Sequence, residues 1–356
     1  MSNLEDTKYM TRALHLAAQG LWTTDPNPRV GCVIVKNGEI VGEGWHHKAG
    51  DFHAEINALQ MAGKNAENST VYVTLEPCCH FGRTPPCSQA LIYAKVSRVV
   101  TAMVDPNPKI AGQGLAQLQA AGIEIKSGVL QEQAEALNVG FIKRMREKLP
   151  FVRLKLAMSL DGRTAMKNGE SQWITSSEAR TDVQKWRARS SAILTGINTI
   201  LADDPALTVR LPNVSRQPLR VILDTHLRIS PQAKIFKENG RNLILTSKET
   251  SLIFPNTKIK QIPLKNGRLD LLEVCKTLAE NEINEVCIEC GATLAGAFIS
   301  EKLVDELILY VAPTFLGDQA RGLLQLPQLI HLQDRINFQI KEIRHIGQDL
   351  CLILRF

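Results

Sequence analysis

Residues 30–45 read VGCVIVKNGEIVGEGW and decide the fold of the N-terminal half. Apolar residues flank the dipeptide Asn37-Gly38 on both sides, and such a dipeptide is the strongest short-range signal for a two-residue hairpin. A helical pattern follows from His53 to Gly63, and residues 71–75 predict a short strand. A hairpin that leads into alternating helices and strands is typical of a mixed α/β sandwich.

Further helices and strands are predicted on both sides of this hairpin from the spacing of apolar residues. The segments before and after the hairpin both contain helices, so we expect helices on both faces of the sheet. The predicted helices cover residues 5–20, 115–121 and 131–147, and the predicted strands cover residues 98–104 and 123–125.

A domain boundary is predicted near residues 146–150. The helix over residues 131–147 closes in a charged run, and Pro150 then breaks the helical pattern. Strand patterning restarts at Phe151. We therefore divide the chain into a domain of residues 1–147 and a domain of residues 148–356.

The C-terminal half alternates again between strands and helices. This order predicts a largely parallel sheet with helices on its faces, while residues 256–268 are predicted to form a surface loop. Strands are expected at 151–158, 192–195, 219–223, 243–246, 286–289 and 307–312, and helices at 177–189, 269–280 and 294–301.

Composition excludes several classes of protein. The chain has 356 residues, 44% of them hydrophobic and 22% charged, which is ordinary for about two globular domains and too apolar for a disordered chain. A net charge of +6 falls short of a basic nucleic-acid-binding surface. No apolar run reaches the 18 residues of a membrane helix, and no signal peptide is visible at Met1. We expect a cytoplasmic protein without a nucleic-acid or membrane partner.

A candidate metal site is formed by His53, Cys78 and Cys87. One imidazole and two thiolates are the ligand set expected for Zn²⁺, and three protein ligands leave the fourth position to water, as in catalytic zinc sites. Glu55 follows His53 by two residues, where it can move a proton without binding the metal.

This pattern is similar to the zinc deaminase signature H-x-E followed by P-C-x-x-C. Here eight residues instead of two separate the cysteines. With that spacing, the chain resembles the deaminase domain of the bifunctional deaminase–reductases of riboflavin biosynthesis. The resemblance rests on the segments Pro26–Gly31, His53–Glu55, Glu76–Cys87 and Asp105–Pro108.

The sequence is compatible with three alternatives to this interpretation. Cys79 or His80 would complete a structural four-ligand site, in which Glu55 would have no role. A tRNA- or nucleobase-editing deaminase would share the metal ligands but would leave residues 150–356 unexplained. A third reading is a non-catalytic scaffold stabilised by zinc.

The second half lacks the Gly-x-Gly-x-x-Gly of a Rossmann nucleotide site after an early strand. Instead, a strand ending at Glu289 runs into small residues and a helix, where N–H groups and positive potential favour a phosphate. Small residues at such a turn also occur for tight packing alone.

Further segments resemble the reductase domain of the same family, which implies a dihydrofolate-reductase-like fold that uses NADPH. They are 156–163, 169–175, 201–210 and 289–297. The NADPH positions implied by the resemblance are Ala157, Trp173, Thr199, Asp203, Gly291, Ala292, Thr293, Leu294, Ala295, Gly296 and Ala297. The implied substrate positions are Ser171, Arg187, Leu207, Arg210 and Glu289.

Together the two resemblances imply a two-step enzyme. The first domain is expected to hydrolyse the 2-amino group from 2,5-diamino-6-(5-phosphoribosylamino)pyrimidin-4-one with one Zn²⁺ and Glu55 as the proton carrier. The second domain is expected to reduce the ribosyl group of the product to ribityl with NADPH. The family also implies a homodimer that assembles through the reductase domain and a small-molecule phosphoribosylaminopyrimidine as substrate.

Overall fold

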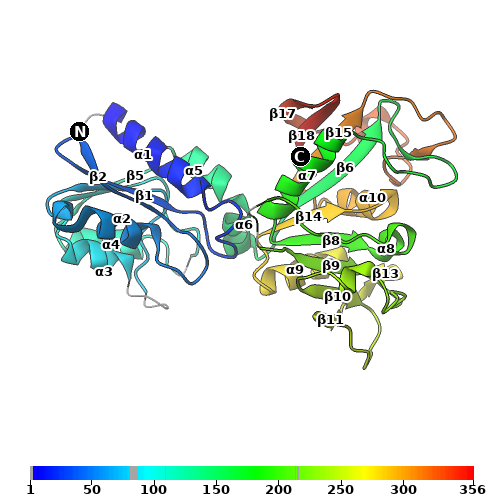
Figure 1. Ribbon diagram of the computed structural model, residues 1–356, viewed down its shortest axis with the longest axis horizontal. Coiled ribbons are helices and arrows are strands. Elements are labelled where there is room, and N and C mark those ends of the chain that lie inside the picture. Colours follow the sequence, from blue (N-terminus) through cyan, green and yellow to red (C-terminus); the bar gives the residue numbers. More distant parts are fainter. Residues whose placement is uncertain (1–2, 81–85, 109, 213, 215) are drawn as a thin grey trace. The chain divides into compact units, whose positions relative to one another are not determined.

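The computed structural model describes residues 3–80, 86–108, 110–212, 214 and 216–356. The chain divides into two compact units, which we call unit 1, ending at Lys148, and unit 2, Leu149–Phe356 (Figure 1). Among the described helices, none is both long and apolar enough to cross a lipid bilayer.

Unit 1 is built on a five-stranded sheet with the order β2-β1-β3-β4-β5. Strand β1, next to the edge strand β2, is antiparallel to β2 and β3, whereas β3, β4 and β5 run parallel. Asn37 and Gly38 have φ angles of 52° and 81°, so the predicted two-residue hairpin is confirmed. The strands are β1 (Gly31–Lys36), β2 (Glu39–Trp45), β3 (Thr70–Val73), β4 (Arg98–Thr101) and β5 (Glu124–Ser127).

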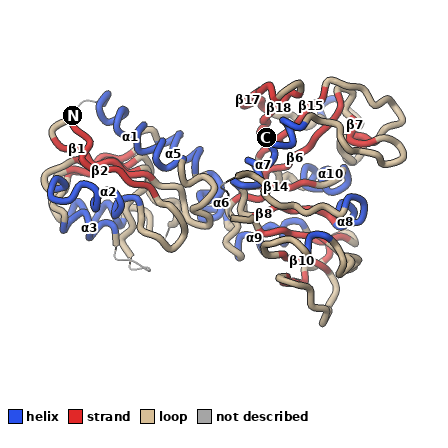
Figure 2. The backbone as a smooth tube through the Cα atoms, viewed as in Figure 1, coloured by secondary structure: helices blue, strands red, loops and turns tan. Residues whose placement is uncertain are grey.

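Helices cover both faces of this sheet (Figure 2). On one face, α1 (Asn3–Ala18), α5 (Gln131–Leu137) and α6 (Val139–Glu147) enclose an apolar core with the sheet. On the other face, α2 (Ala54–Ala62), α3 (Cys87–Tyr93) and α4 (Gln113–Ala120) enclose a second core, and a 3₁₀ turn, η1 (Gly63–Ala66), follows α2. The predicted α/β/α sandwich is confirmed.

The single helix predicted over residues 131–147 is wrong, because the structure has two helices that meet at Asn138. Asn138 is buried and non-helical, with φ −120°. Its side chain accepts the N–H of Arg29 at 2.8 Å and donates to the Arg29 carbonyl at 3.0 Å. This long-range pairing interrupts the helix, and an apolar period cannot reveal it.

Unit 2 is built on a nine-stranded sheet with the order β11-β10-β9-β8-β14-β6-β15-β18-β17. All pairs from β11 to β15 are parallel, and only the pairs of β18 with β15 and β17 are antiparallel, so the predicted largely parallel sheet is confirmed. The strands are β6 (Phe151–Ser159), β8 (Ala192–Gly196), β9 (Leu219–Leu223), β10 (Asn242–Thr246), β11 (Thr257–Gln261), β14 (Glu285–Glu289), β15 (Glu306–Ala312), β17 (Gln339–Ile346) and β18 (Asp349–Arg355).

Helices also cover both faces of this larger sheet. The main apolar core lies under α9 (Leu271–Glu280) and α10 (Ala292–Ser300). The opposite face is covered by α7 (Ser177–Arg189) and α8 (Ile197–Asp203), each over its own smaller core. Short elements complete the unit: β7 (Arg163–Ala165) pairs with β16 (Arg321–Gly322), β12 (Leu264–Lys265) pairs with β13 (Arg268–Leu269), and η2 (Lys234–Phe236) and η3 (Leu332–Asp334) are 3₁₀ turns.

The surface loop predicted over residues 256–268 is wrong, because β11 lies within it and pairs in parallel with β10. β11 is one of the two edge strands of this sheet, and its sequence TKIKQ is mostly polar and exposed. Edge strands often carry lysines because these hinder pairing with other chains. Such a strand has no apolar pattern, so its sequence does not indicate a strand.

Candidate active sites

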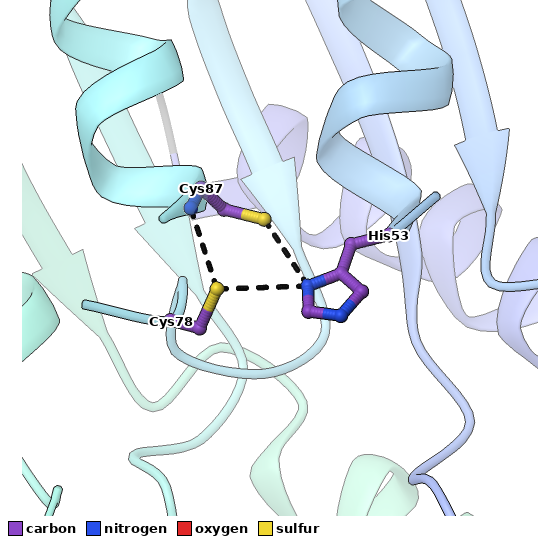
Figure 3. Close-up of side chains that lie close together, drawn as sticks. All are labelled: His53, Cys78 and Cys87. Atoms are coloured by element: carbon purple, nitrogen blue, oxygen red, sulfur yellow. Dashed lines mark hydrogen bonds between the residues drawn. The ribbon is translucent and has the colours of Figure 1, made fainter. Parts of the chain in front are cut away.

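The structure brings the three predicted metal ligands of unit 1 together (Figure 3). His53 is the N-cap residue of α2, Cys87 is the first residue of α3, and Cys78 lies in the loop that follows β3. His53 Nδ1 lies 3.3 Å from Cys87 Sγ and 3.5 Å from Cys78 Sγ. All three ligand atoms lie within 4.8 Å of one another.

These distances fit one zinc ion. Tetrahedral zinc with ordinary Zn–S and Zn–N lengths separates a sulfur from a nitrogen ligand by about 3.6 Å. The two observed separations, 3.3 and 3.5 Å, are close to that value. The nitrogen and two sulfurs also form a donor set that favours zinc over calcium or magnesium.

Small side chains let α2 lie close to the sheet, which places His53 at the edge of the core. Ala54 and Ala58 are fully buried, and Asn57 Nδ2 donates to the Trp45 carbonyl at the end of β2 at 2.9 Å. A second imidazole, His46, is also buried, and its ring lies edge-on to the His53 ring with 5.4 Å between centroids.

His46 is itself held by two hydrogen bonds. Its Nε2 lies 3.0 Å from Asn27 Nδ2, and its Nδ1 lies 3.1 Å from the Phe52 carbonyl. These partners assign the tautomer with the proton on Nδ1. Burial lowers the pKa of His46, so the ring is neutral near pH 7.

The two thiols of the cluster differ in acidity. Hydrogen bonds from Cys87 and from His53 lower the pKa of Cys78 against the opposing effect of burial. The Cys78 interaction and burial raise the pKa of Cys87. Cys78 is therefore the first of the two to become a thiolate, which is the form that binds a metal.

Glu55 lies beside this cluster without belonging to it. The side chain is 3% exposed, on the first turn of α2, and its carboxyl group contacts the Cys87 thiol. Burial, together with the negative charge of Cys78, raises the pKa of Glu55 to about 7. A carboxyl group in such a place can both take and give a proton near neutral pH.

A four-ligand structural site gains no support from the part of the chain that the structure describes. The candidate ligand group contains neither Cys79 nor His80. The Cys79 thiol points to Gln113 Oε1 at 3.9 Å instead. Residues 81–85 of the segment Glu76–Cys87 lie outside the described residues.

In unit 2, three adjacent parallel strands bring several predicted cofactor positions to the carboxyl ends of the strands, which we call the cofactor edge. β8, β14 and β6 are neighbours in the sheet. Thr199 lies in α8, directly after β8; Gly291 is the N-cap residue of α10, after β14; Ala157 lies near the end of β6. In open parallel sheets ligands bind outside the carboxyl ends of the strands, which is this edge.

Small residues occupy the turn before α10 and the helix itself for two different reasons. A Cβ at Gly296 would lie 2.0 Å from the Gln325 carbonyl oxygen, so packing requires a glycine there. A Cβ at Gly291 would meet no atom within 4 Å, which leaves space for a ligand. Thr293 Oγ1 donates to Gln325 Oε1 at 2.7 Å. Close packing thus explains the glycine at position 296, whereas the open space beside Gly291 is consistent with a bound cofactor.

Two predicted substrate positions form an ion pair at the same edge. Arg187 of α7 donates from Nε to Glu289 Oε1 at 2.6 Å and from Nη2 to Oε2 at 2.9 Å. A third nitrogen, Nη1, donates to the Thr208 carbonyl at 3.0 Å. Although burial opposes it, the Arg187 charge lowers the pKa of Glu289 to about 2, so Glu289 is ionised near pH 7.

Sequence reasoning missed Lys155, which lies opposite Glu289 in the pairing of β6 with β14. Its charge also lowers the pKa of Glu289. Arg153 and Lys155 alternate with apolar residues in the β6 sequence FVRLKLAMS. Two cations on one side of a central strand were a signal that this face of the sheet is charged.

The remaining predicted positions lie outside this ion pair, and Leu207 directly precedes Thr208, whose carbonyl accepts from Arg187. Leu207 is buried with φ 49°, whereas Arg210 is exposed and its N–H donates to Gln184 Oε1 at 3.0 Å. Trp173 is 67% exposed and lies over the Arg180 guanidinium, 4.5 Å from ring centroid to Cζ. Ser171 lies in the segment between β7 and α7, and Asp203 is the last residue of α8. Within the described residues, no hydrogen bond joins Trp173, Ser171 or Asp203 to the Arg187–Glu289 pair.

Comparison with protein families divides the chain in the same order. Residues 4–103 match the family described as the cytidine and deoxycytidylate deaminase zinc-binding region. Residues 150–352 match the family described as the RibD C-terminal domain. The first match contains His53, Glu55, Cys78 and Cys87, and the second contains the Arg187–Glu289 pair.

Full-length relatives are similar over nearly the whole chain. Riboflavin biosynthesis protein RibD of Escherichia coli K12 is 52% identical over 99% of both chains, and that of Haemophilus influenzae is 52% identical over 98% of this chain and 96% of its own. Among solved structures, Acinetobacter baumannii RibD has a TM-score of 0.94 at 45% identity. The deaminase/reductase of Thermotoga maritima has a TM-score of 0.90 at 33% identity, and both structures match over 99% of each chain.

Proposed function

The chain belongs to the family of the riboflavin biosynthesis protein RibD, and from this premise we propose which of its residues carry the two reactions. It is a bifunctional enzyme with a cytidine-deaminase-like fold followed by a dihydrofolate-reductase-like fold. It removes the 2-amino group from 2,5-diamino-6-(5-phosphoribosylamino)pyrimidin-4-one and then reduces the ribosyl group of the product to ribityl with NADPH.

For the deaminase step, we propose that His53, Cys78 and Cys87 hold one zinc ion. The observation that carries this assignment is the approach of His53 Nδ1 to both thiols, at 3.5 and 3.3 Å. Zinc bound by three protein ligands lowers the pKa of a water at its fourth position to about 7. Hydrogen bonds among the three ligands keep the Cys78 sulfur and the His53 imidazole close together, in position to bind the ion.

Glu55 is the proposed proton carrier of this step. Its carboxyl group is buried beside the ligands, so protons pass between it and the reacting groups with little competition from bulk water. It takes a proton from the attacking water and gives it to the ring nitrogen. It then takes the proton of the new hydroxyl group and gives it to the amino group, which leaves as ammonia. A metal scaffold would need no such carboxyl group, which is the observation against that alternative.

For the reductase step, we propose that NADPH lies along the carboxyl ends of β6, β8 and β14. Bound NADPH supplies the hydride, and the protein orients it. Ala157, Thr199 and the open side of Gly291 support this placement, with the N–H groups of α10 facing a phosphate. The remaining proposed contacts are Trp173, Asp203, Ala292, Thr293, Leu294, Ala295, Gly296 and Ala297.

The substrate is proposed to lie between the Arg187–Glu289 pair and the segment that ends at Arg210. Glu289 is ionised and accepts two hydrogen bonds from Arg187. Each carboxylate oxygen keeps a further lone pair, which we propose accepts a hydrogen bond from a substrate hydroxyl group. Arg210 is exposed, and its fork of donors suits the substrate phosphate. Leu207 and Ser171 complete the proposed set.

A coupled assay tests the two-step function directly. The purified chain receives the phosphoribosylaminopyrimidine, zinc and NADPH, and ammonia release is followed together with nicotinamide absorbance. We expect one NADPH consumed for each ammonia released, and no NADPH oxidation when zinc is removed from the deaminase site. An editing deaminase would release ammonia from RNA or free nucleobases and would leave NADPH unchanged.

We further propose that two copies of the chain assemble through unit 2. β17 is an edge strand of the large sheet, with Ile340 59% and Ile343 56% exposed. Two exposed isoleucines on an edge strand whose other residues are mostly polar are a small apolar surface that a second chain can cover. Sedimentation equilibrium should give twice the mass of one chain. Replacing Ile340 and Ile343 together by lysine should give the monomer mass; an unchanged dimer contradicts this interface.

A cytoplasmic location is proposed from the cysteines. All eight lie in described parts of the chain, and none of them forms a disulfide there, as is usual in a reducing compartment. Fractionation of the cells that make the protein, followed by immunodetection, tests this location. Recovery in a membrane or secreted fraction would contradict it.

A further inference from the structure

Glu76 is a buried carboxylate that neither reaction uses, and it lies two residues before the metal ligand Cys78. Its side chain is 4% exposed. Each carboxylate oxygen accepts two main-chain N–H groups, and all four come from one segment of unit 1. The donors are Asp105 (3.0 Å) and Gly112 (2.9 Å) to Oε2, and Gly114 (2.8 Å) and Leu115 (3.3 Å) to Oε1.

These bonds replace the missing cap of α4. The first N–H groups of a helix have no partner within the helix and need an acceptor from outside. Gly112, the N-cap residue, has φ 80° and no side chain that could accept. Glu76 accepts the N–H groups of the second and third residues instead. A Cβ at Gly114 would lie 2.0 Å from the Pro77 carbonyl oxygen, so α4 and the loop before Cys78 are in direct contact.

The second cysteine is tied to the same helix. Ser88, which follows Cys87, donates from Oγ to Gln117 Oε1 of α4 at 2.8 Å. The Ser88 N–H donates to the Cys78 carbonyl at 3.1 Å, and the Cys87 N–H donates to Cys78 Sγ at 3.3 Å. Both cysteine segments therefore have their position fixed relative to α4.

We propose that α4 is the template that sets the separation of the two thiolates and that Glu76 is its positioning residue. With two residues between the cysteines, as in P-C-x-x-C, a single turn of chain fixes both ligands. Here eight residues intervene, so the two cysteines do not share a single turn of chain. The four N–H bonds that Glu76 accepts hold the loop before Cys78 against α4 instead. This inference rests on the proposed zinc site.

The test is the zinc affinity of full-length Glu76→Gln. Glutamine keeps the size but turns an NH₂ group toward N–H donors, so part of the cap is lost. Loss of a residue that orients metal ligands weakens metal binding by about 10- to 100-fold. We expect that increase in the zinc dissociation constant in competition with a chromophoric chelator. The thiolate-to-metal absorption of the cobalt-loaded protein should also change, while NADPH binding to unit 2 stays the same.

Asp6→Asn is the matched control. Asp6 is another fully buried carboxylate of unit 1, hydrogen-bonded to Tyr72, Arg98 and Lys126. None of its hydrogen bonds within the described part of the chain reaches the segment from Glu76 to Ser88. It should lower the stability of the fold and leave zinc affinity and the cobalt spectrum unchanged. A folded Glu76→Gln protein that matches Asp6→Asn in both readouts overturns the proposal.

Ser88→Ala decides the matter if Glu76→Gln does not fold, because it removes the Gln117 bond without disturbing a buried charge. Loss of one hydrogen bond should weaken zinc binding by roughly 2- to 10-fold. Zinc affinity equal to that of the unaltered chain overturns the template role. If Cys78→Ala still binds one zinc per chain, the proposed zinc site itself is wrong, which is a separate outcome.

Discussion

The metal centre of unit 1 and the cofactor edge of unit 2 are built in opposite ways. In unit 1 the three candidate ligands lie within 4.8 Å of one another, and Glu55 lies two residues from one of them. In unit 2 the predicted contacts come from β6, α7, α8, β14 and α10 and from the segments between them. Among the residues that the structure describes, only Arg187 and Glu289 join two of these elements by a hydrogen bond between predicted contact side chains.

The difference follows from what each reaction asks of the protein. Ligands of one metal ion must all lie about 2 Å from it, so their identity and closeness are fixed by chemistry. A nicotinamide carries its own reactive atom, and the protein contributes orientation and electrostatics over the length of a large molecule. We therefore expect single substitutions to act strongly in unit 1 and more gradually in unit 2.

The largest effect is expected for Glu55→Gln. The amide keeps the size of the side chain but cannot carry a proton, so ammonia release should fall by about 10²–10⁴-fold. Zinc content and the reduction of deaminated substrate should stay the same, since neither depends on this carboxyl group. The check is ammonia release beside a metal assay, and ammonia release within a few-fold of the unaltered chain would refute the role of Glu55.

Protein stability tests whether the Glu289 carboxylate of unit 2 is ionised and paired with Arg187. Glu289→Gln leaves the Arg187 charge without its partner, which should lower the free energy of unfolding by roughly 3 kcal/mol near pH 7. The folded-state pKa of Glu289 is lowered to about 2, below its unfolded value. The advantage of the unaltered chain is therefore fully present above pH 5 and shrinks as the pH falls from about 4 toward 2.

Glu273→Gln is the control for this pH experiment. Glu273 pairs with Lys276 on the exposed surface of α9, so its loss should change stability by at most about 0.5 kcal/mol. Urea unfolding of both variants between pH 3 and pH 7 makes the comparison. A gap between Glu289→Gln and the unaltered chain that widens as the pH falls would contradict the ionised pair.

Sequence patterns predicted what local rules control. The hairpin at Asn37-Gly38 depends on two positive φ angles, which that dipeptide adopts readily. The ligands His53, Cys78 and Cys87 were predicted because few residue types bind zinc. The alternation of strands and helices predicted the parallel sheet of unit 2.

Long-range contacts could not be predicted in the same way. The break at Asn138 depends on Arg29, which is 109 residues away in the chain. Strand β11 depends on pairing with β10, since its own residues are polar. The position of Lys155 opposite Glu289 is a register between two strands that only the folded sheet defines.

A moderate effect is expected for Arg210→Ala. Its guanidinium is exposed and has no side-chain hydrogen bond among the described residues, so its removal disturbs little of the fold. Loss of a charged hydrogen bond to the substrate phosphate costs about 1.5–3 kcal/mol, or roughly 10- to 150-fold in binding. The Michaelis constant for the deaminated substrate should rise, and added salt should narrow the difference. Weaker NADPH binding with unchanged substrate binding would instead assign Arg210 to the cofactor.

The smallest effect is expected from separating the two units. Each has its own sheet and its own buried clusters, so residues 1–147 and 148–356 should each fold when made alone. The first fragment should bind zinc and release ammonia at close to the rate of the full chain, because its ligands and Glu55 all lie within it. The second should bind NADPH without zinc, and sedimentation should be measured beside it, since this fragment also carries the proposed dimer edge at β17. Loss of zinc binding by a folded first fragment would mean that the metal centre depends on unit 2, and the contrast between a self-contained metal site and a dispersed cofactor edge would then fail.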